Sequence, residues 1–343
     1  MVKLSVCMIV KDEARMLEQT LPALSKQADE IILLDTGSSD DTVEVAKRLG
    51  AKVHHFAWVN DFSAARNESL KHATGEWIIW ADADEFWKEE DLESLKETLK
   101  TAKDNAYDLT IYESKIGQCE KMTGFNRAKV FRNGLGYHFV KPINEQLVEA
   151  NGQVVKGEVL PVPVYHWGRN LEGEKMNEKR ERYVKLYSQS LEKNESDACV
   201  HFMLATNLSE LKRLPEALEH FNRTAELAAE KDIGRRALEK KADILLRLKK
   251  LPDAAKTAQL LLEKDPNNVP ARNVFASIYL AIGKIDEAIQ VLEEALSIKI
   301  EDRIENQYLT KALPNFLLSK AYGIKGDKGK AEKCLEEYKR IMG

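Results

Sequence analysis

The sequence is poor in cysteine, with four in 343 residues, and these four lie far apart without any CxxC pair. Such scarcity argues against a disulfide-stapled scaffold, and the missing pairs argue against the usual zinc-binding patterns. Isolated thiols are typical of a reducing compartment, so we expect a cytoplasmic protein. The cysteines are Cys7, Cys119, Cys199 and Cys334.

Long apolar runs and an excess of one charge sign are also missing. No stretch approaches the roughly 18 apolar residues of a membrane-spanning helix, so we expect no transmembrane segment. The 52 Lys and Arg residues against 56 Asp and Glu residues give a net charge of −4, which argues against nucleic acid as a partner. The apolar run Leu4–Val10 lacks a small-residue cleavage site, so it is expected to be a buried first strand rather than a signal peptide.

The residues that are present fit a globular protein of two domains. Hydrophobic residues make up 43% and charged residues 31% of the chain, which is far from the composition of a disordered protein. At roughly 100–200 residues per domain, the chain can build two hydrophobic cores. We place the domains at 1–172 and 173–343, because the pattern of the sequence changes between them.

In the first of these domains, short apolar runs alternate with amphipathic stretches. This alternation predicts an α/β domain with a mainly parallel, Rossmann-like sheet, in which ligands bind beyond the carboxyl ends of the strands. The expected strands are Leu4–Val10, Glu30–Asp35, Lys52–Phe56 and Trp77–Asp82, and the expected helices are Ala14–Gln27, Thr42–Leu49 and Ser63–Ala73.

The second domain has no strand patterns and repeats itself every 34 residues. Ala242 and Ala276 are one pair at this spacing, and three more pairs share it. That period, with small residues where paired helices cross, is the signature of tetratricopeptide repeats. We therefore predict an all-α solenoid with full repeats at 235–268 and 269–302; the alternative is a generic helical bundle.

Three carboxylates follow the strand predicted at Trp77–Asp82, within the run Asp82-Ala83-Asp84-Glu85. Carboxylates at the end of a buried strand are costly unless something compensates their charge. Mg²⁺ or Mn²⁺, which prefer oxygen ligands, would do so. The alternative is that these acids cap the helix expected near Glu89–Ala102.

Two further segments carry candidate ligand-binding residues. Asp35 ends a predicted strand, where a carboxylate could accept a hydrogen bond from a nucleotide base, and Ser38 or Ser39 is expected to cap the next helix. Arg66 lies on the first turn of a helix that Ser63 could cap. Since guanidinium binds phosphate in a bidentate manner, Arg66 is a candidate diphosphate clamp; the alternative is an exposed surface arginine.

Taken in order, these segments resemble glycosyltransferase family 2, which has the GT-A fold. The resemblance covers roughly residues 1–170 and points to the branch of lipopolysaccharide-core and sublancin-type peptide S-glycosyltransferases. The peptide S-glycosyltransferases also carry a helical repeat domain after the catalytic domain. The matching segments are Ser5–Glu13, Glu30–Thr42, Asp61–Asn67, Asp82–Glu85, Lys129–Asn133, Ile143–Leu147 and Tyr165–Gly168.

The resemblance implies an inverting, metal-dependent, hexosyltransferase-type enzyme that uses Mn²⁺ or Mg²⁺ and a nucleotide-sugar donor, with a UDP-sugar expected. Glu145 would be the catalytic base, and Asp82 and Asp84 would bind the metal. His166 would be a third metal ligand or, alternatively, a structural strand histidine. The residues that would bind the nucleotide sugar are Val10, Lys11, Glu13, Asp35, Gly37, Arg66, Asn67, Asp82 and Ala83.

One position departs from the pattern of that branch, which usually has His before the catalytic Glu. Here Asn144 precedes Glu145, so activity or acceptor choice could differ from that of the branch. Several aromatic residues are expected to serve structure, with Trp58 alternatively shaping the donor site. These residues are His54, His55, Trp58, Trp77, Trp80 and Trp87.

The leading hypothesis is a bacterial enzyme that transfers a sugar to a Ser, Thr or Cys side chain of a protein or peptide. A lipid-linked saccharide or cell-surface glycan is the alternative acceptor. The chain could instead be a non-catalytic repeat scaffold with a degenerate glycosyltransferase domain. Because repeat solenoids present a concave surface, the second domain could hold a polypeptide acceptor near Glu145 or could mediate a homodimer.

Overall fold

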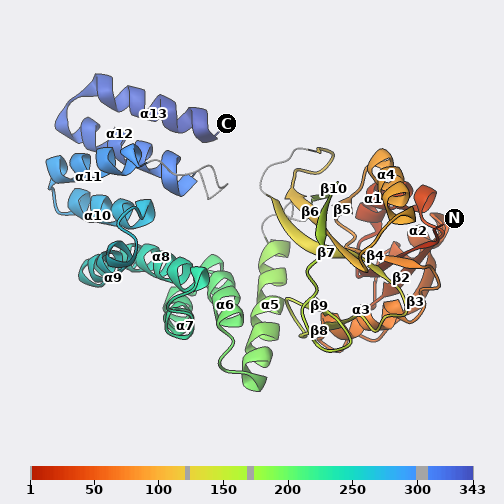
Figure 1. The fold of residues 1–343 in the computed structure, drawn as a ribbon. Helices are drawn as coiled ribbons and strands as arrows, with labels where there is room; N and C mark the ends of the chain where they lie inside the picture. Colours follow the sequence, from red (N-terminus) through yellow and green to blue (C-terminus); the bar gives the residue numbers. More distant parts are fainter. Residues whose placement is uncertain (1, 120–123, 168–173, 299–307, 343) are drawn as a thin grey trace. The chain divides into compact units, whose positions relative to one another are not determined.

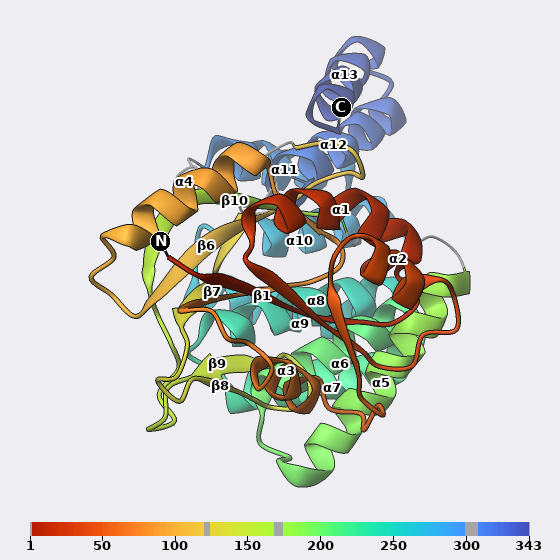
Figure 2. The same cartoon turned by 90° about the vertical axis from the view of Figure 1, so that its right-hand side faces the viewer.

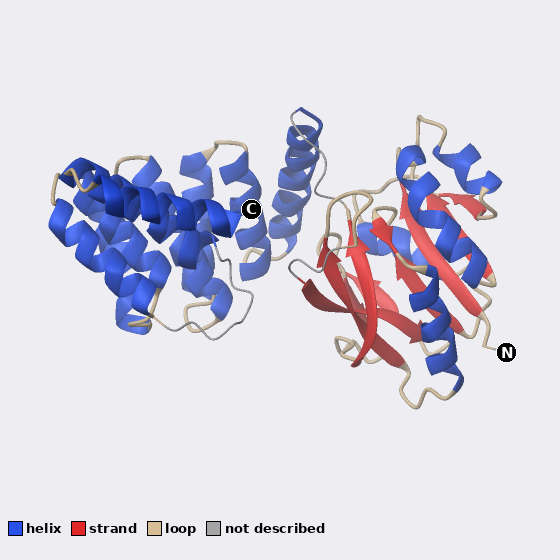
Figure 3. Ribbon diagram, turned by 90° about the horizontal axis from the view of Figure 1, so that it is seen from above, coloured by secondary structure: helices blue, strands red, loops and turns tan. Residues whose placement is uncertain are grey.

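The chain divides into two compact units, Met1–Met176 and Asn177–Gly343 (Figure 1). The predicted domain boundary between residues 172 and 173 lies outside the described residues. Among the described residues the strands are confined to the first unit, as Figure 3 shows. The computed structural model describes four stretches of the chain, residues 2–119, 124–167, 174–298 and 308–342.

An eight-stranded sheet forms the centre of the first unit, in the order β3-β2-β1-β4-β7-β6-β10-β5. Strands β1 to β4 are parallel to one another, and β6 is parallel to β10, which confirms the mainly parallel sheet. Strands β7 and β5 run antiparallel to their neighbours. The strands are β1 (Leu4–Val10), β2 (Glu30–Asp35), β3 (Lys52–His55), β4 (Trp77–Ala81), β5 (Glu85–Phe86), β6 (Ala106–Glu113), β7 (Gly124–Arg132) and β10 (Glu158–His166).

Helices and a short ribbon cover the two faces of this sheet. Figures 1 and 2 show α1 and α4 on one face, with α3 and the ribbon of β8 and β9 on the other. The helices are α1 (Ala14–Gln27), α2 (Thr42–Arg48), α3 (Phe62–Leu70) and α4 (Glu89–Lys100), and the antiparallel ribbon is β8 (His138–Val140) and β9 (Gln146–Val148).

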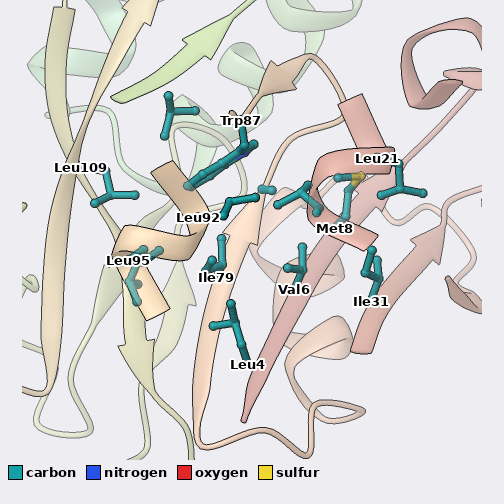
Figure 4. Close-up of a cluster of buried hydrophobic side chains, with 14 of the residues drawn as sticks. Leu4, Val6, Met8, Leu21, Ile31, Ile79, Trp87, Leu92, Leu95 and Leu109 are labelled. Atoms are coloured by element: carbon teal, nitrogen blue, oxygen red, sulfur yellow. The ribbon is translucent and has the colours of Figure 1, made fainter. Parts of the chain in front are cut away.

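Side chains that alternate along the strands fill a separate core on each face. Leu4, Val6 and Met8 of β1 lie in the core beneath α1 and α4, part of which Figure 4 shows. Ile78 and Trp80 of β4 belong to the core on the other face, together with residues of the β8–β9 ribbon. The face that carries α3 is therefore the one on which Trp80 lies.

The carboxyl ends of β2, β1 and β4 meet at one edge of the sheet. In the register of these parallel strands, Val10 lies opposite Asp35 and Met8 lies opposite Ala81. Asp35, the last residue of β2, and Asp82, which follows β4, therefore lie at the same edge on either side of β1. This is the edge at which ligands bind in parallel sheets.

The helix caps differ from those that the sequence predicted. Asp61, not Ser63, is the N-cap of α3, and its carboxylate accepts a hydrogen bond from the Ala64 N–H at 2.9 Å. Both residue types cap well, and they are two positions apart, so sequence did not decide between them. The N-cap of α2 is Asp41 rather than Ser38 or Ser39.

The N-terminus of α4 excludes the capping alternative for the three carboxylates at 82–85. The N-cap of α4 is Lys88, which makes no side-chain capping bond. The acids of the first turn are Glu89, Glu90 and Asp91. The carboxylates that follow β4 therefore have another role.

Paired helices make up the second unit, and the 34-residue pattern marks their crossings. Ala242, Ala254, Ala276 and Ala288 are all fully buried, as small residues at helix crossings should be. Residues 299–302 of the second predicted repeat lie outside the described residues. The helices are α5 (Glu174–Lys193), α6 (Ala198–Glu210), α7 (Leu214–Leu227), α8 (Asp232–Arg247), α9 (Leu251–Lys264), α10 (Val269–Ala281), α11 (Ile285–Ser297), α12 (Leu313–Lys325) and α13 (Lys328–Met342), with a π-helical turn at Tyr308–Ala312.

None of the helices that the structure describes is both long and apolar enough to cross a lipid bilayer.

Candidate active site

Arg66 joins two of the other predicted site residues. It projects from α3, and its side chain is only 6% exposed. Its Nη2 donates to Asp82 Oδ1 at 2.7 Å, and its Nε donates to Glu145 Oε1 at 2.9 Å. Asp82 follows β4 and Glu145 precedes β9, so one guanidinium connects the sheet edge to the ribbon. The structure thus brings together the candidate phosphate, metal and base residues.

The charges of this cluster reinforce one another. Burial by itself would raise the pKa of Asp82, but the positive charges of Arg66, Lys129 and Arg127 hold it well below its ordinary value. Burial opposes the charge of Arg66, whereas Asp82 and Glu145 raise the pKa of its guanidinium. Asp82 is therefore a carboxylate and Arg66 a cation at neutral pH.

Trp80 lies against three cationic side chains. The Arg66 Cζ is 4.2 Å, the Arg127 Cζ 4.7 Å and the Lys129 Nζ 3.4 Å from a centroid of its ring system. These distances are within the range of cation–π attraction. Trp80 is 2% exposed, as expected of a core residue. Its ring also orders the cations of the site.

Lys129 and Glu85 form an ion pair within the protein interior. The Lys129 side chain is fully buried, and its Nζ lies 2.6 Å from Glu85 Oε1. Glu85 Oε2 also accepts a hydrogen bond from the Asp82 N–H at 3.0 Å. Burial raises the pKa of Glu85 and lowers that of Lys129, because it disfavours both charges. The pair fixes the backbone of the acidic loop that follows β4.

Asp84 lies next to His166, the other predicted metal ligand. His166 Nε2 is 3.3 Å from Asp84 Oδ2, and its Nδ1 is 3.3 Å from Glu113 Oε2. Burial disfavours the imidazolium, yet the hydrogen bonds with Asp84 and Glu113 raise the pKa of His166 to about 10. The Trp167 N–H also donates to the Asp84 main-chain oxygen at 2.8 Å. Gly168, which ends the family-like segment, lies outside the described residues.

The side chains around Asp84 suit a divalent cation that is held partly by the protein and partly by a bound substrate. Among the residues that the structure describes, no group of three or more His, Cys, Asp or Glu side chains is arranged as a metal site. Mg²⁺ and Mn²⁺ are often held by one or two carboxylates together with substrate phosphates. Asp84 and His166 lie side by side. Because the raised pKa keeps His166 protonated at neutral pH, its imidazole would have to lose a proton to ligate a metal, as metal-binding histidines do. On that condition the two residues fit a metal that is completed by phosphate oxygens.

Asp35 is buried at the end of β2 and is bound by its own loop. Its carboxylate accepts hydrogen bonds from the N–H groups of Gly37 at 3.2 Å and Ser38 at 3.0 Å. Its Oδ2 lies 3.2 Å from His55 Nδ1 on β3. Burial would raise the pKa of Asp35, but these bonds lower it. Gly37 has a φ of +104°, which glycine adopts without strain, and this allows the loop to fold back on Asp35.

Two other predicted nucleotide residues make contacts within the fold. The Asn67 amide donates to the Phe139 carbonyl at 2.8 Å and accepts from the Phe139 N–H at 2.7 Å. It thereby ties α3 to β8. The Ala83 carbonyl accepts a hydrogen bond from Thr20 Oγ1 of α1 at 2.8 Å. Both contacts hold the acidic loop and α3 in place.

The remaining predicted residues lie where β1 leads into α1. Val10 is buried at the end of β1, and Lys11 after it is exposed. The Glu13 N–H donates to Thr42 Oγ1 at 2.7 Å. These residues share the strand edge with Asp35 but are not among the residues that Arg66 joins.

Three residues of this site, Lys129, Arg127 and Glu113, have no predicted role, although Lys129 begins one of the segments of the family resemblance. Lysine is rarely buried in proteins, so nothing in the sequence marked Lys129 as interior. A usable signal was the spacing of Arg127 and Lys129, which puts both on one face of β7.

Comparisons with known proteins agree with this geometry. Residues 5–150 match glycosyl transferase family 2, and residues 202–269 and 242–303 match tetratricopeptide repeats. The first unit therefore contains a family 2 glycosyltransferase domain, and the second contains tetratricopeptide repeats. The recognition made from the sequence is confirmed.

Individual relatives share parts of the chain. A tetratricopeptide repeat-containing protein of Synechococcus elongatus is 36% identical over 180 residues, which are 50% of this chain and 44% of that protein. The glycosyltransferase SunS of Bacillus subtilis is 25% identical over 221 residues, which are 63% of this chain and 51% of SunS. The chain thus spans about half the length of these curated relatives. A crystal structure of S. aureus TarS aligns with a TM-score of 0.40 and 15% identity, over 82% of this chain and 92% of that structure.

Proposed function

We propose that this protein is a metal-dependent, inverting glycosyltransferase that moves a sugar from a nucleotide diphosphate to a Ser, Thr or Cys side chain of a protein or peptide. The observation that carries the proposal is the guanidinium of Arg66, bonded to Asp82 and Glu145. It supports one site in which a donor-side carboxylate and a candidate base lie together. The family 2 domain supports the reaction class.

The reaction asks little covalent chemistry of the protein. In an inverting transfer, the acceptor oxygen or sulfur attacks the anomeric carbon as the bond to the diphosphate breaks. Glu145 would take the acceptor proton as general base, and its bond to Arg66 orients the carboxylate for that task. A divalent cation held by Asp84 and His166 would stabilise negative charge on the departing diphosphate. Asp35 would accept a hydrogen bond from the nucleobase of the donor at the strand edge.

The backbone next to Glu145 fits this positioning. Asn144 has a φ of +52°, in the left-handed region that Asn and His adopt more readily than most residues. The replacement of the usual His by Asn144 therefore suits the turn that presents Glu145. We assign Asn144 a conformational role, which leaves Glu145 able to act.

The protein acceptor is proposed because a repeat unit accompanies the family 2 domain in one chain. Tetratricopeptide repeats present concave surfaces that bind extended segments. A donor that carries uracil is the first choice, since Asp35 could accept the N3–H of that base.

Thermal unfolding with UDP, GDP and dTDP, each with and without Mn²⁺, tests the enzyme proposal. A ligand that binds only the folded protein raises the free energy of unfolding, by about 2.7 kcal/mol at a hundredfold excess over Kd. The unfolding midpoint rises accordingly. We expect one nucleotide to stabilise the protein only with Mn²⁺, and we expect Asp84→Ala to abolish the effect.

Glu97→Ala, an exposed carboxylate of α4, is the matched control and should respond like the wild type. A protein that responds to no nucleotide, with or without metal, would instead favour the non-catalytic scaffold. Purified protein, lipid-linked and glycan acceptors then separate the possible acceptor classes.

A further inference from the structure

The guanidinium of Arg66 is already occupied by two carboxylates. Its Nε and Nη2 donate to Glu145 and Asp82, and the side chain is only 6% exposed. The remaining N–H donors of Arg66 are enclosed together with the rest of its side chain, so little of the guanidinium is open to a diphosphate. The position of Arg66 suits a residue that holds other groups in place.

Lys129 is likewise buried and already paired with a carboxylate. Its side chain is fully buried, and its Nζ lies 2.6 Å from Glu85 Oε1. Of the three cations against Trp80 in the described part of the chain, two are therefore enclosed and paired.

Arg127, the third cation, is accessible. Its side chain is 34% exposed. Its Nη2 donates to the Glu145 main-chain oxygen at 3.0 Å and lies 3.6 Å from Glu145 Oε1. The same Glu145 Oε1 accepts from Arg66, which also binds Asp82, so Arg127 belongs to the cluster that contains the donor-side carboxylate. A guanidinium has five N–H donors, so it can hold Glu145 and still bind an anion.

We propose that Arg127 binds the diphosphate of the donor, and that Arg66 is a positioning residue for Asp82 and Glu145. This inference rests on the proposed function. In the transfer, the bond between the anomeric carbon and the β-phosphate oxygen breaks, and its electron pair stays on that oxygen. The acceptor atom forms the new bond and gives its proton to Glu145. Arg127 donates hydrogen bonds to the phosphate as its charge grows.

A comparison of nucleoside diphosphates with nucleosides isolates this contact. Binding of UDP, GDP and dTDP, and of uridine, guanosine and thymidine, is measured by calorimetry with Mn²⁺ and with EDTA. For the diphosphate that the wild type binds best, Arg127→Gln should weaken binding about tenfold or more, as expected for a lost hydrogen bond between charged groups. Binding of the matching nucleoside should not change. Arg127→Lys should restore part of the affinity.

Arg132→Gln is the matched control. Arg132 lies on the same strand, with its Cζ 4.5 Å from a ring centroid of Trp77 and its Nη1 2.5 Å from Glu76 Oε1. Like Arg127, it stacks on a tryptophan and pairs with a glutamate, but these are Trp77 and Glu76 and not residues of the site. This variant should bind the diphosphate like the wild type.

Each other result has a definite meaning. If Arg127→Gln binds the diphosphate as well as the wild type does, the inference is wrong and the proposed function stands. Equal losses for diphosphate and nucleoside would also overturn it, because Arg127 would then only shape the site. If the wild type binds no diphosphate more tightly than its nucleoside, both the inference and the proposed donor class fail.

Discussion

Lys129 and Glu85 are two opposite charges enclosed in the first unit, close to the acidic loop. The exposed fractions of their side chains are 0% and 2%. A buried pair of this kind adds little net stability, since desolvation offsets the attraction between the charges. Removal of one partner, however, leaves the other charge buried without compensation. The pair therefore makes the loop of Asp82 sensitive to a single substitution.

We expect Lys129→Met to lower the free energy of unfolding by about 3–5 kcal/mol, the usual cost of breaking a buried ion pair. The double variant Lys129→Met with Glu85→Gln should recover part of this loss, because the uncompensated carboxylate is gone. Urea denaturation measures both values.

Lys100→Met serves as the control, since Lys100 pairs with Glu97 on the surface of α4. Exposed pairs contribute about 0–1 kcal/mol. A loss in Lys129→Met no larger than that of Lys100→Met would show that the interior pair does not support the loop.

The sequence predicted which individual residues belong to the site, but not which residues they contact. Asp35 and Asp82 were found because each ends an apolar run, and strand ends of parallel sheets lie at one edge. Arg66 and Glu145 are 79 positions apart, and no local pattern relates them. The two carboxylates on Arg66 follow from the packing of α3 against the sheet, which tertiary structure alone determines.

Glu30 connects three elements at the start of β2. Its carboxylate accepts hydrogen bonds from Ser5 Oγ at 2.6 Å and the Thr74 N–H at 2.6 Å, and Lys52 Nζ lies 2.7 Å away. Burial would raise the pKa of Glu30, but the bonds from Lys52, Ser5 and Thr74 lower it to about 2. The carboxylate thus ties β2 to β1, β3 and the loop before β4.

This contact predicts a pH dependence of stability. The pKa of Glu30 is about 2 in the folded protein against 4.5 ordinarily. Its contribution is therefore complete above pH 5 or so and is lost as the pH falls toward 2. We expect Glu30→Gln to be less stable at pH 7 by about 2–3 kcal/mol and to lose less stability between pH 6 and pH 3. Denaturant titrations at several pH values measure the difference.

Glu97→Gln changes an exposed carboxylate and should leave the pH profile of the wild type intact. Parallel profiles for Glu30→Gln and the wild type would contradict the prediction.

Elements were easier to predict than their ends. Strands β1 and β2 and helix α1 begin and end where the sequence indicated, because each is a clear run or an amphipathic period. Helix α3 begins at Phe62 rather than at Ser63, since Asp61 supplies the cap. Strand β10 is the last strand along the chain, yet it lies between β6 and β5 in the sheet. This place could not be predicted, because strand order in a sheet depends on long-range pairing.

The two units differ in what they contribute to the proposed transfer. The first contains Asp82, Asp84 and Glu145, and the second contains the repeats. If the repeats hold the acceptor, deletion of 177–343 should abolish transfer to protein and leave slow hydrolysis of the donor. Mass spectrometry of the acceptor and an assay of released nucleotide measure the two activities.

The full chain with Glu145→Gln is the complement of that deletion, since it keeps the repeats and lacks the base. It should bind acceptor and transfer no sugar. Normal protein glycosylation by 1–176 alone would show that the repeats serve another purpose, such as dimerisation.

Because Nη2 and Nε of a single guanidinium bind Asp82 and Glu145, whatever draws one carboxylate away must strain its bond to the other. Binding on the donor side and binding on the acceptor side are then coupled. The coupling free energy is the same whichever of the two binds first. If the proposed transfer takes place, donor and acceptor would then bind cooperatively through one side chain.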